Sequence, residues 1–90
     1  MKQFSFTIED ENGIHARPAG MIVSCAKQYV STVSVKTPTK EADGKRLLSV
    51  MSLGAVRGTH VTVTVEGADE DRAVAALKEV CKEHLGYDQA

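Results

Sequence analysis

Three stretches of the chain alternate apolar and polar residues with a period of two, which predicts half-buried β-strands. They cover residues 2–8, 30–37 and 60–66, and most of their apolar side chains are phenylalanine, isoleucine and valine. A short polar stretch at 40–42 has the length and composition of an edge strand. Because serine and threonine fill most of the alternate positions, we expect a sheet with one covered and one open face.

Three other stretches place apolar residues at helical spacing. They cover residues 16–29, 47–53 and 69–85. Pro18 marks the first turn of the first helix, because the N–H that proline lacks has no intrahelical partner there. His15 is therefore expected at or near the N-cap, with Arg17 just inside. Gly54 and Gly86 are expected to end the second and third helices, which leaves residues 87–90 as a tail.

The elements follow the order β-α-β-β-α-β-α. A sheet with one open face requires all three helices to cover the other face. A right-handed crossover joins the first two strands, and the last strand fits between them in the split arrangement. We therefore expect an α+β fold, with a four-stranded, mainly antiparallel sheet and three helices on one face, in a single domain spanning 1–90.

Composition excludes several classes of function. Eleven basic and twelve acidic residues give a net charge of −1, so neither nucleic acid nor an anionic membrane is expected as the main partner. No apolar run is long enough to span a membrane, and the first residues lack the apolar block of a signal peptide. Cys25 and Cys81 are expected to be reduced, packed thiols of a cytoplasmic protein. The three histidines lack the spacing of metal ligands, so we expect neither a metal nor a cofactor.

His15 and Arg17 are the candidate chemical groups. A helix start presents free N–H groups, here those of Ala16 and Arg17, and the positive end of the helix dipole, so it favours anions. Neutral imidazole is abundant at neutral pH and is nucleophilic. The guanidinium of Arg17 could contact phosphate oxygens at two points. The pattern predicts a group that accepts, holds and releases a phosphoryl group. The alternatives are a simple polar cap for His15 and a solvated cation for Arg17.

The second helix holds too many apolar residues for one buried stripe. They are Leu47, Leu48, Val50, Met51 and Leu53. We expect Leu47 or Leu48 to be at least partly exposed, which favours a partner surface over simple core packing. In the first helix, Gly20 either permits close packing or leaves room for a partner.

The segment from Gly13 to Ala19 resembles the active-site signature of the HPr family, the histidine-containing phosphocarriers of the bacterial sugar phosphotransferase system. The resemblance extends over nearly the whole chain, including residues 50–54 and the turn at Gly58. It implies an open-faced sandwich that takes phosphate from phosphoenolpyruvate-charged enzyme I and passes it to the A domains of sugar-specific enzymes II.

The resemblance also implies residue roles. His15 would be phosphorylated on Nδ1, with Arg17 in contact with the phosphate. The surface that docks both partners would comprise Gly20, Met21, Leu47, Leu48 and Met51. We expect a monomer.

Arg46 departs from the family pattern. Members usually carry a lysine–serine pair just before the short helix, and here the pair is Lys45–Arg46. A kinase that modifies that serine has no hydroxyl to act on, so serine-based regulation is in doubt. Two other functions stay open beside sugar transport. They are a regulatory binding module and a carrier in a paralogous circuit for nitrogen control or dihydroxyacetone phosphorylation.

Overall fold

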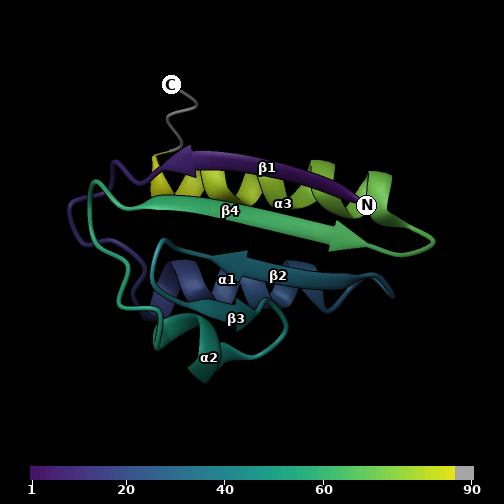
Figure 1. Ribbon diagram of the computed structural model, residues 1–90, viewed down its shortest axis with the longest axis horizontal. Helices are drawn as coiled ribbons and strands as arrows, with labels where there is room; N and C mark the ends of the chain where they lie inside the picture. The colour runs from purple at the N-terminus through teal and green to yellow at the C-terminus, as the bar shows by residue number, and fades with distance from the viewer. Residues whose placement is uncertain (87–90) are drawn as a thin grey trace.

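The computed structural model describes residues 1–86, and within them four strands and three helices follow one another in the expected order (Figure 1). The elements are β1 Lys2–Thr7, α1 Ala16–Ala26, β2 Thr32–Lys36, β3 Glu41–Asp43, α2 Leu47–Met51, β4 His60–Glu66 and α3 Glu70–Leu85. The tail expected at 87–90 lies outside the described residues.

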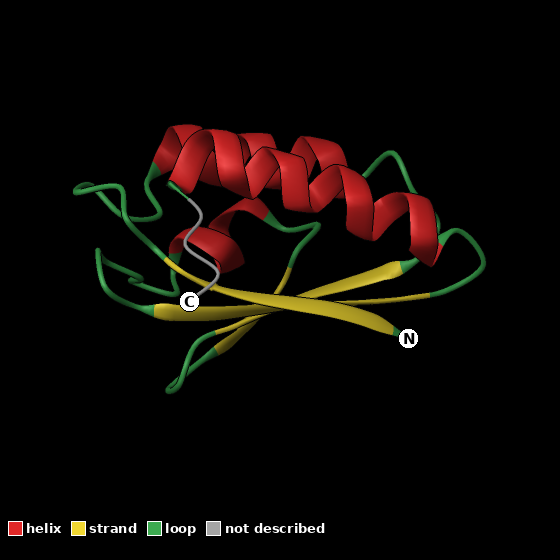
Figure 2. Cartoon of the chain, turned by 90° about the horizontal axis from the view of Figure 1, so that it is seen from above, coloured by secondary structure: helices red, strands yellow, loops and turns green. Residues whose placement is uncertain are grey.

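The sheet has the split arrangement. Its strand order is β1-β4-β2-β3, and every neighbouring pair is antiparallel. The last strand of the chain thus lies between the first two. Figure 2 shows the three helices on one side of the sheet, and within residues 1–86 no helix covers the other side. The expected α+β fold with one open face is confirmed.

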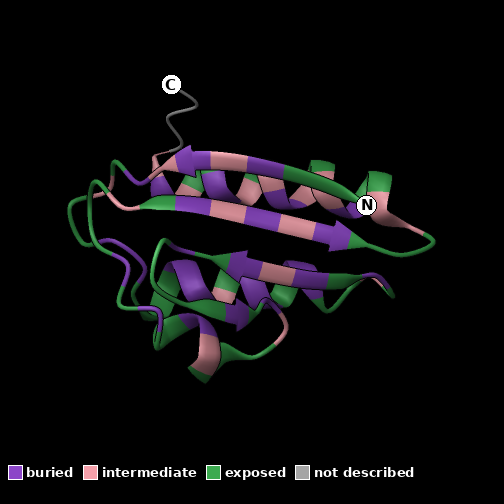
Figure 3. Cartoon of the chain, in the orientation of Figure 1, coloured by how far each residue is buried: buried purple, intermediate pink, exposed green. Residues whose placement is uncertain are grey.

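Alternation along the strands produces the core. The strand register aligns Phe4, Val63, Val35 and Ala42 in one row across all four strands, and all four are buried. Figure 3 shows the resulting alternation of buried and less buried residues along β4. On the open face, the hydroxyls of Ser5 and Thr62 share a hydrogen bond of 2.9 Å. The apolar faces of the helices pack against this buried row and cover it.

The prediction was wrong about where the first helix ends. α1 stops at Ala26 rather than Tyr29, and β2 begins at Thr32 rather than Val30. The Tyr29 N–H donates to the carbonyl three residues back, and the Lys45 ammonium donates to the Tyr29 carbonyl at 2.7 Å. A side chain distant in sequence therefore hydrogen-bonds to a backbone group that would otherwise continue the helix or the strand.

Smaller boundary differences have similar local causes. α2 ends at Met51 rather than Leu53, because the Leu53 N–H donates to a carbonyl three residues back in a tighter turn. β3 covers 41–43 rather than 40–42, because the Lys40 carbonyl closes the hairpin by accepting from the Thr37 N–H at 2.8 Å. Gly86 caps α3 in the left-handed conformation, as expected.

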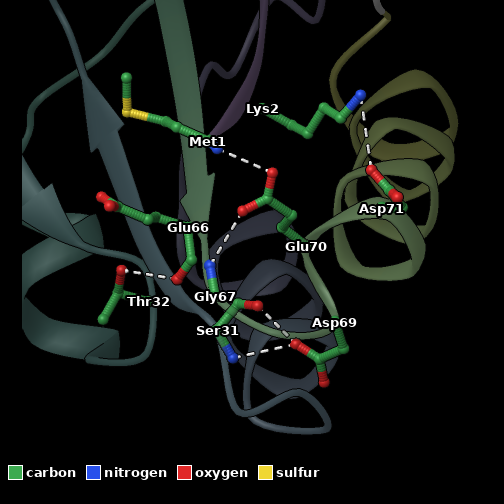
Figure 4. A network of polar contacts seen from close by, with 9 residues as sticks. All are labelled: Met1, Lys2, Ser31, Thr32, Glu66, Gly67, Asp69, Glu70 and Asp71. Atoms are coloured by element: carbon green, nitrogen blue, oxygen red, sulfur yellow. Dashed lines mark hydrogen bonds and ion pairs between the residues drawn. The ribbon is translucent and has the colours of Figure 1, made fainter.

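Asp69 joins the two loops at one end of the molecule. Its carboxylate accepts the N–H groups of Val30 and Ser31, each at 3.0 Å, and the Ser31 hydroxyl (Figure 4). Asp69 is the N-cap residue of α3, but its side chain makes no cap hydrogen bond to its own helix. The neighbouring Glu70 accepts from the Gly67 N–H at 3.1 Å. Asp69 thereby fixes the start of α3 against the chain that leaves α1.

The unfolding free energy is expected to depend on pH through Asp69. The Ser31 hydroxyl, followed by the two backbone N–H groups, holds the pKa of Asp69 below its ordinary value, so folding favours the carboxylate. This stabilisation is complete above the unfolded pKa of about 4 and is lost as pH falls through the folded pKa. Denaturant unfolding should show Asp69→Asn less stable than the unchanged chain at about pH 7, with a smaller difference near pH 2.

The control for that measurement is Asp71→Asn. Asp71 is exposed, and within residues 1–86 its carboxylate pairs only with the Lys2 ammonium, at 3.5 Å. It should change stability little at either pH. A gap between Asp69→Asn and the unchanged chain that stays constant with pH would contradict the assigned role.

Candidate functional site

His15 is the N-cap residue of α1, as expected from the sequence. Its backbone is extended, and its carbonyl accepts the Ala19 N–H at 3.0 Å, which starts the helix. The imidazole makes no cap hydrogen bond, and the residue is exposed. The backbone of His15 thus forms the cap without its side chain. The imidazole is therefore available for chemistry.

The helix start beside His15 offers donors and a positive field. Ala16 and Arg17 occupy the first two helical positions, where N–H groups have no intrahelical partner, and no acidic residue lies in the first turn. Both residues are exposed, whereas Pro18 is buried. Within residues 1–86 the Arg17 side chain makes no hydrogen bond or ion pair, so its guanidinium is available to an anion.

The loop that precedes His15 is fixed from two sides. The Ile14 N–H donates to the Ala55 carbonyl at 2.9 Å, and the N–H groups of Glu9 and Asp10 donate to the Leu85 carbonyl. Gly13 has a φ of 64°, and a Cβ added there would lie 2.3 Å from the Ala55 oxygen. The end of α3 and the segment after α2 therefore determine where the imidazole stands.

Sequence reasoning missed the segment around Ala55. Its contact with Gly13 and Ile14 joins residues about forty positions apart, which leaves no periodic signal in the sequence. The close approach of two backbones at that glycine becomes visible only in the fold.

The apolar residues of α2 and of the turn that follows it divide as expected. Val50 and Leu53 are buried, whereas the exposed fractions are 42% for Leu47, 78% for Leu48 and 37% for Met51. On α1, which packs against α2, Met21 is 41% exposed. A Cβ at Gly20 would meet no atom within 4 Å, so this glycine leaves open space and does not serve close packing. We call the five residues Gly20, Met21, Leu47, Leu48 and Met51 the apolar patch.

Arg46 stands at the start of the apolar patch. It is the N-cap residue of α2, has extended backbone and makes no side-chain cap bond, as expected for a residue without an acceptor. Its Nε lies 3.7 Å from the Asp43 carboxylate in an exposed ion pair. The patch therefore begins next to a positive charge.

The other nucleophilic side chains are less suited to phosphate. Cys25 and Cys81 are free and buried, and burial raises the pKa of both thiols, that of Cys81 to about 12. They stay protonated at neutral pH and are poor nucleophiles. His60 is exposed at the start of β4, and His84 lies in the last turn of α3. Over residues 1–86, no three His, Cys, Asp or Glu side chains gather as a metal site would require.

Membrane insertion is a separate matter from the site. Among the described residues, none of the helices combines the length and the apolar character needed to cross a membrane.

Known proteins resemble the chain in sequence and in fold. A family profile described as "PTS HPr component phosphorylation site" matches residues 2–83. A phosphocarrier protein HPr of Lysinibacillus sphaericus is 46% identical over 77 residues, which is 86% of this chain and 88% of the relative.

Two solved structures extend the comparison. The histidine-containing phosphocarrier protein of Mycoplasma is 30% identical with a TM-score of 0.89, over 91% of this chain and 93% of that one. An HPr dimer from Thermoanaerobacter tengcongensis is 34% identical with a TM-score of 0.72, over 92% and 95%. Because that relative is dimeric, the monomer expected for this chain stays a prediction.

Proposed function

The chain belongs to the HPr family, the phosphocarrier proteins of the phosphotransferase system, and from this membership we propose that enzyme I phosphorylates His15. The chain then passes the group to the A domains of sugar-specific enzymes II in the cytoplasm, and acts as a monomer. The observation that carries the proposal is the exposed imidazole of His15, unused in capping, beside the free N–H groups of α1.

In the reaction at His15, a bond from phosphorus to the histidine replaces the bond from phosphorus to the donor, and the reaction is reversible. The lone pair of Nδ1 attacks the phosphorus carried by enzyme I, the new P–N bond forms, and the bond to the donor breaks with its electron pair going to the donor. The Arg17 guanidinium and the N–H groups of Ala16 and Arg17 stabilise the charge on the phosphoryl oxygens during transfer. A second exchange returns the electron pair to His15 when an enzyme II accepts the group.

The apolar patch docks both partners in turn. Leu48 is the most exposed of its residues, and Arg17 and Arg46 add positive charge near its two helix starts. The sequences of α1 and α2 contain no acidic residue. A partner face with an apolar centre and carboxylates around it is complementary to this surface.

Intact mass after incubation with enzyme I and phosphoenolpyruvate tests the proposal directly. We expect the gain of one phosphate that acid removes and base leaves in place, followed by its loss when an enzyme II A domain is added. An enzyme I that phosphorylates another HPr but not this chain would overturn the proposed function.

Arg17→Ala is expected to slow phosphate gain by about tenfold to a hundredfold, because a charge-stabilising donor is lost from the transition state. Its side chain is exposed, so the unfolding free energy should change by less than about 0.5 kcal/mol. Initial rates from quenched mass spectra measure the effect. Arg72→Ala, an exposed arginine on α3, is the control and should keep the original rate. Equal rates for both variants would remove Arg17 from the transfer step.

Leu48→Glu is expected to weaken binding to enzyme I and to an enzyme II A domain by about tenfold or more, because it places a carboxylate in the apolar centre of the contact. Folding should hardly change, since the Leu48 side chain is 78% exposed. Calorimetric titration measures both affinities. Val30→Glu is a matched control, because Val30 is 77% exposed but follows the opposite end of α1. Equal affinities for the two variants would show that partners dock elsewhere.

A further inference from the structure

A hollow on the open face of the sheet has no part in the function described so far. Its volume is ≈ 320 Å³, which is within the size range of small-molecule sites. Figure 1 views the sheet from this open side. None of the lining residues is acidic. The turn residues 37–38 and three strands line the hollow, the strands through Gln3, Lys36, His60, Thr62 and Thr64.

The strand register brings these side chains together. Thr62 of β4 stands opposite Lys36 of β2, and Thr64 stands opposite Gln3 of β1. His60 precedes Thr62 by two residues on β4, so both point to the open face. Because neighbouring strands lie about 4.8 Å apart, one small ligand can contact all five side chains at once.

Two of the side chains are available to an anion. Lys36 and His60 are exposed, and within residues 1–86 neither side chain makes a hydrogen bond or an ion pair. The register also places Glu41 opposite Lys36, but the Glu41 carboxylate accepts the Ser34 hydroxyl at 2.6 Å. Imidazole carries a ring N–H in either protonation state. The hollow therefore offers an ammonium and an imidazole N–H to the same anion.

The other polar groups of the hollow are neutral and have bonding capacity left. The hydroxyls of Thr62 and Ser5 share a hydrogen bond of 2.9 Å, and the Thr64 hydroxyl lies 3.5 Å from Gln3 Oε1. A hydroxyl has one donor and two acceptor positions, and a primary amide has two donors. Each of these groups can therefore also bond to a hydroxyl of a ligand.

The turn that closes the hollow is held in one conformation. The Thr37 N–H donates to the Lys40 carbonyl at 2.8 Å. The Thr37 hydroxyl oxygen accepts from the N–H groups of Thr39 and Lys40, at 3.4 and 3.1 Å. Pro38 lies between these bonds and its φ is restricted by the ring. A wall that is ordered in advance loses little conformational entropy when a ligand binds.

We propose that this hollow binds a small phosphate ester that carries several hydroxyl groups, a phosphorylated polyol. The phosphate lies between Lys36 and His60, because an ammonium is a strong point donor to phosphate oxygens. The hydroxyls lie along Gln3, Thr62 and Thr64. No Phe, Tyr or Trp lines the hollow, so a nucleobase would lack a ring to stack on. The three helices cover the other face of the sheet, and the site does not depend on the proposed function.

Titration of the isotope-labelled chain with glucose-6-phosphate, followed by amide chemical shifts, tests the proposal. We expect saturable shifts at Gln3, Lys36, His60, Thr62 and Thr64, with a dissociation constant of about 1 mM or below. Inorganic phosphate and glucose each make only part of the contacts, so each should bind at least about tenfold more weakly.

Two lysine variants separate the site from a general effect of charge. Lys36→Met should weaken binding of glucose-6-phosphate by about tenfold, because the charged donor is lost. Lys27→Met removes the same charge from the exposed C-cap of α1, on the side of the helices, and should leave the affinity unchanged. Both lysines are exposed, so neither variant should lose its fold, which circular dichroism checks.

Three results would overturn the proposal. Shifts confined to residues 15–17 would place the phosphate at the start of α1. Equal affinities of Lys36→Met and Lys27→Met would show that the hollow does not hold the charge. Equal affinities for glucose-6-phosphate and inorganic phosphate would show that the hydroxyls are not recognised. Phosphate gain from enzyme I is measured separately, so the proposed function can stand when this inference fails, and the reverse.

Discussion

Alanine in place of His15 is expected to abolish phosphate gain from enzyme I, with the initial rate lowered by at least about a thousandfold. The reason is the loss of the attacking nitrogen, because neither Arg17 nor the N–H groups of α1 can form a bond to phosphorus. The measurement is intact mass after incubation with enzyme I and phosphoenolpyruvate, followed by an acid treatment that removes phosphohistidine.

The fold should survive this substitution. The helix begins through the His15 carbonyl, which alanine retains, and the lost imidazole makes no cap hydrogen bond. We expect the unfolding free energy to change by less than about 0.5 kcal/mol, so that a failure of transfer reports chemistry and not unfolding. His60→Ala and His84→Ala are the controls and should gain phosphate normally. Acid-labile phosphate on the His15 variant would move the acceptor to one of those two residues.

Gly13→Ala is expected to lower the unfolding free energy by roughly 3 kcal/mol, the second large effect. Two costs combine at this position. A side chain is disfavoured at a φ of 64°, and its Cβ would lie 2.3 Å from the Ala55 oxygen, which is backbone and cannot rotate away. The contact that orients the His15 loop must then open, so phosphate transfer should slow as well.

Two other glycines separate these costs. Gly54 has nearly the same φ, 61°, but an added Cβ meets no atom within 4 Å, so Gly54→Ala should lose only about 1 kcal/mol. Gly20 is helical and equally open, so Gly20→Ala should gain up to about 1 kcal/mol. Denaturant unfolding of the three variants measures the series. If Gly13→Ala and Gly54→Ala lost the same stability, steric overlap with Ala55 would not matter.

The strands and the local part of the site were predictable because their signals lie within a few residues. Valine alternation in β4 reports which face is buried, and Pro18 reports that a helix begins near His15. Gly13, Ile14, Arg17 and Pro18 are neighbours of His15 in sequence, so the anion site could be proposed without a fold. The partial exposure of Leu47 and Leu48 followed from the short length of α2.

What could not be predicted depends on contacts between distant residues. The end of α1 was misplaced because Asp69 and Lys45 bind backbone groups at 29–31, and no periodicity in the sequence encodes such bonds. The support of the His15 loop by Ala55 was missed for the same reason. The roles of the apolar patch and of Arg17 stay predictions, because they concern partners and phosphate.

The separate duties of the His15 backbone and side chain have a thermodynamic consequence. Since the imidazole holds no cap hydrogen bond, loading it with a phosphoryl group breaks no cap contact of the free chain. The loaded and unloaded forms can then share one conformation, and the energy stored in the P–N bond is not dissipated by refolding. Such a carrier works close to equilibrium in both directions, so the ratio of loaded to unloaded molecules can follow the balance between phosphate supply and demand.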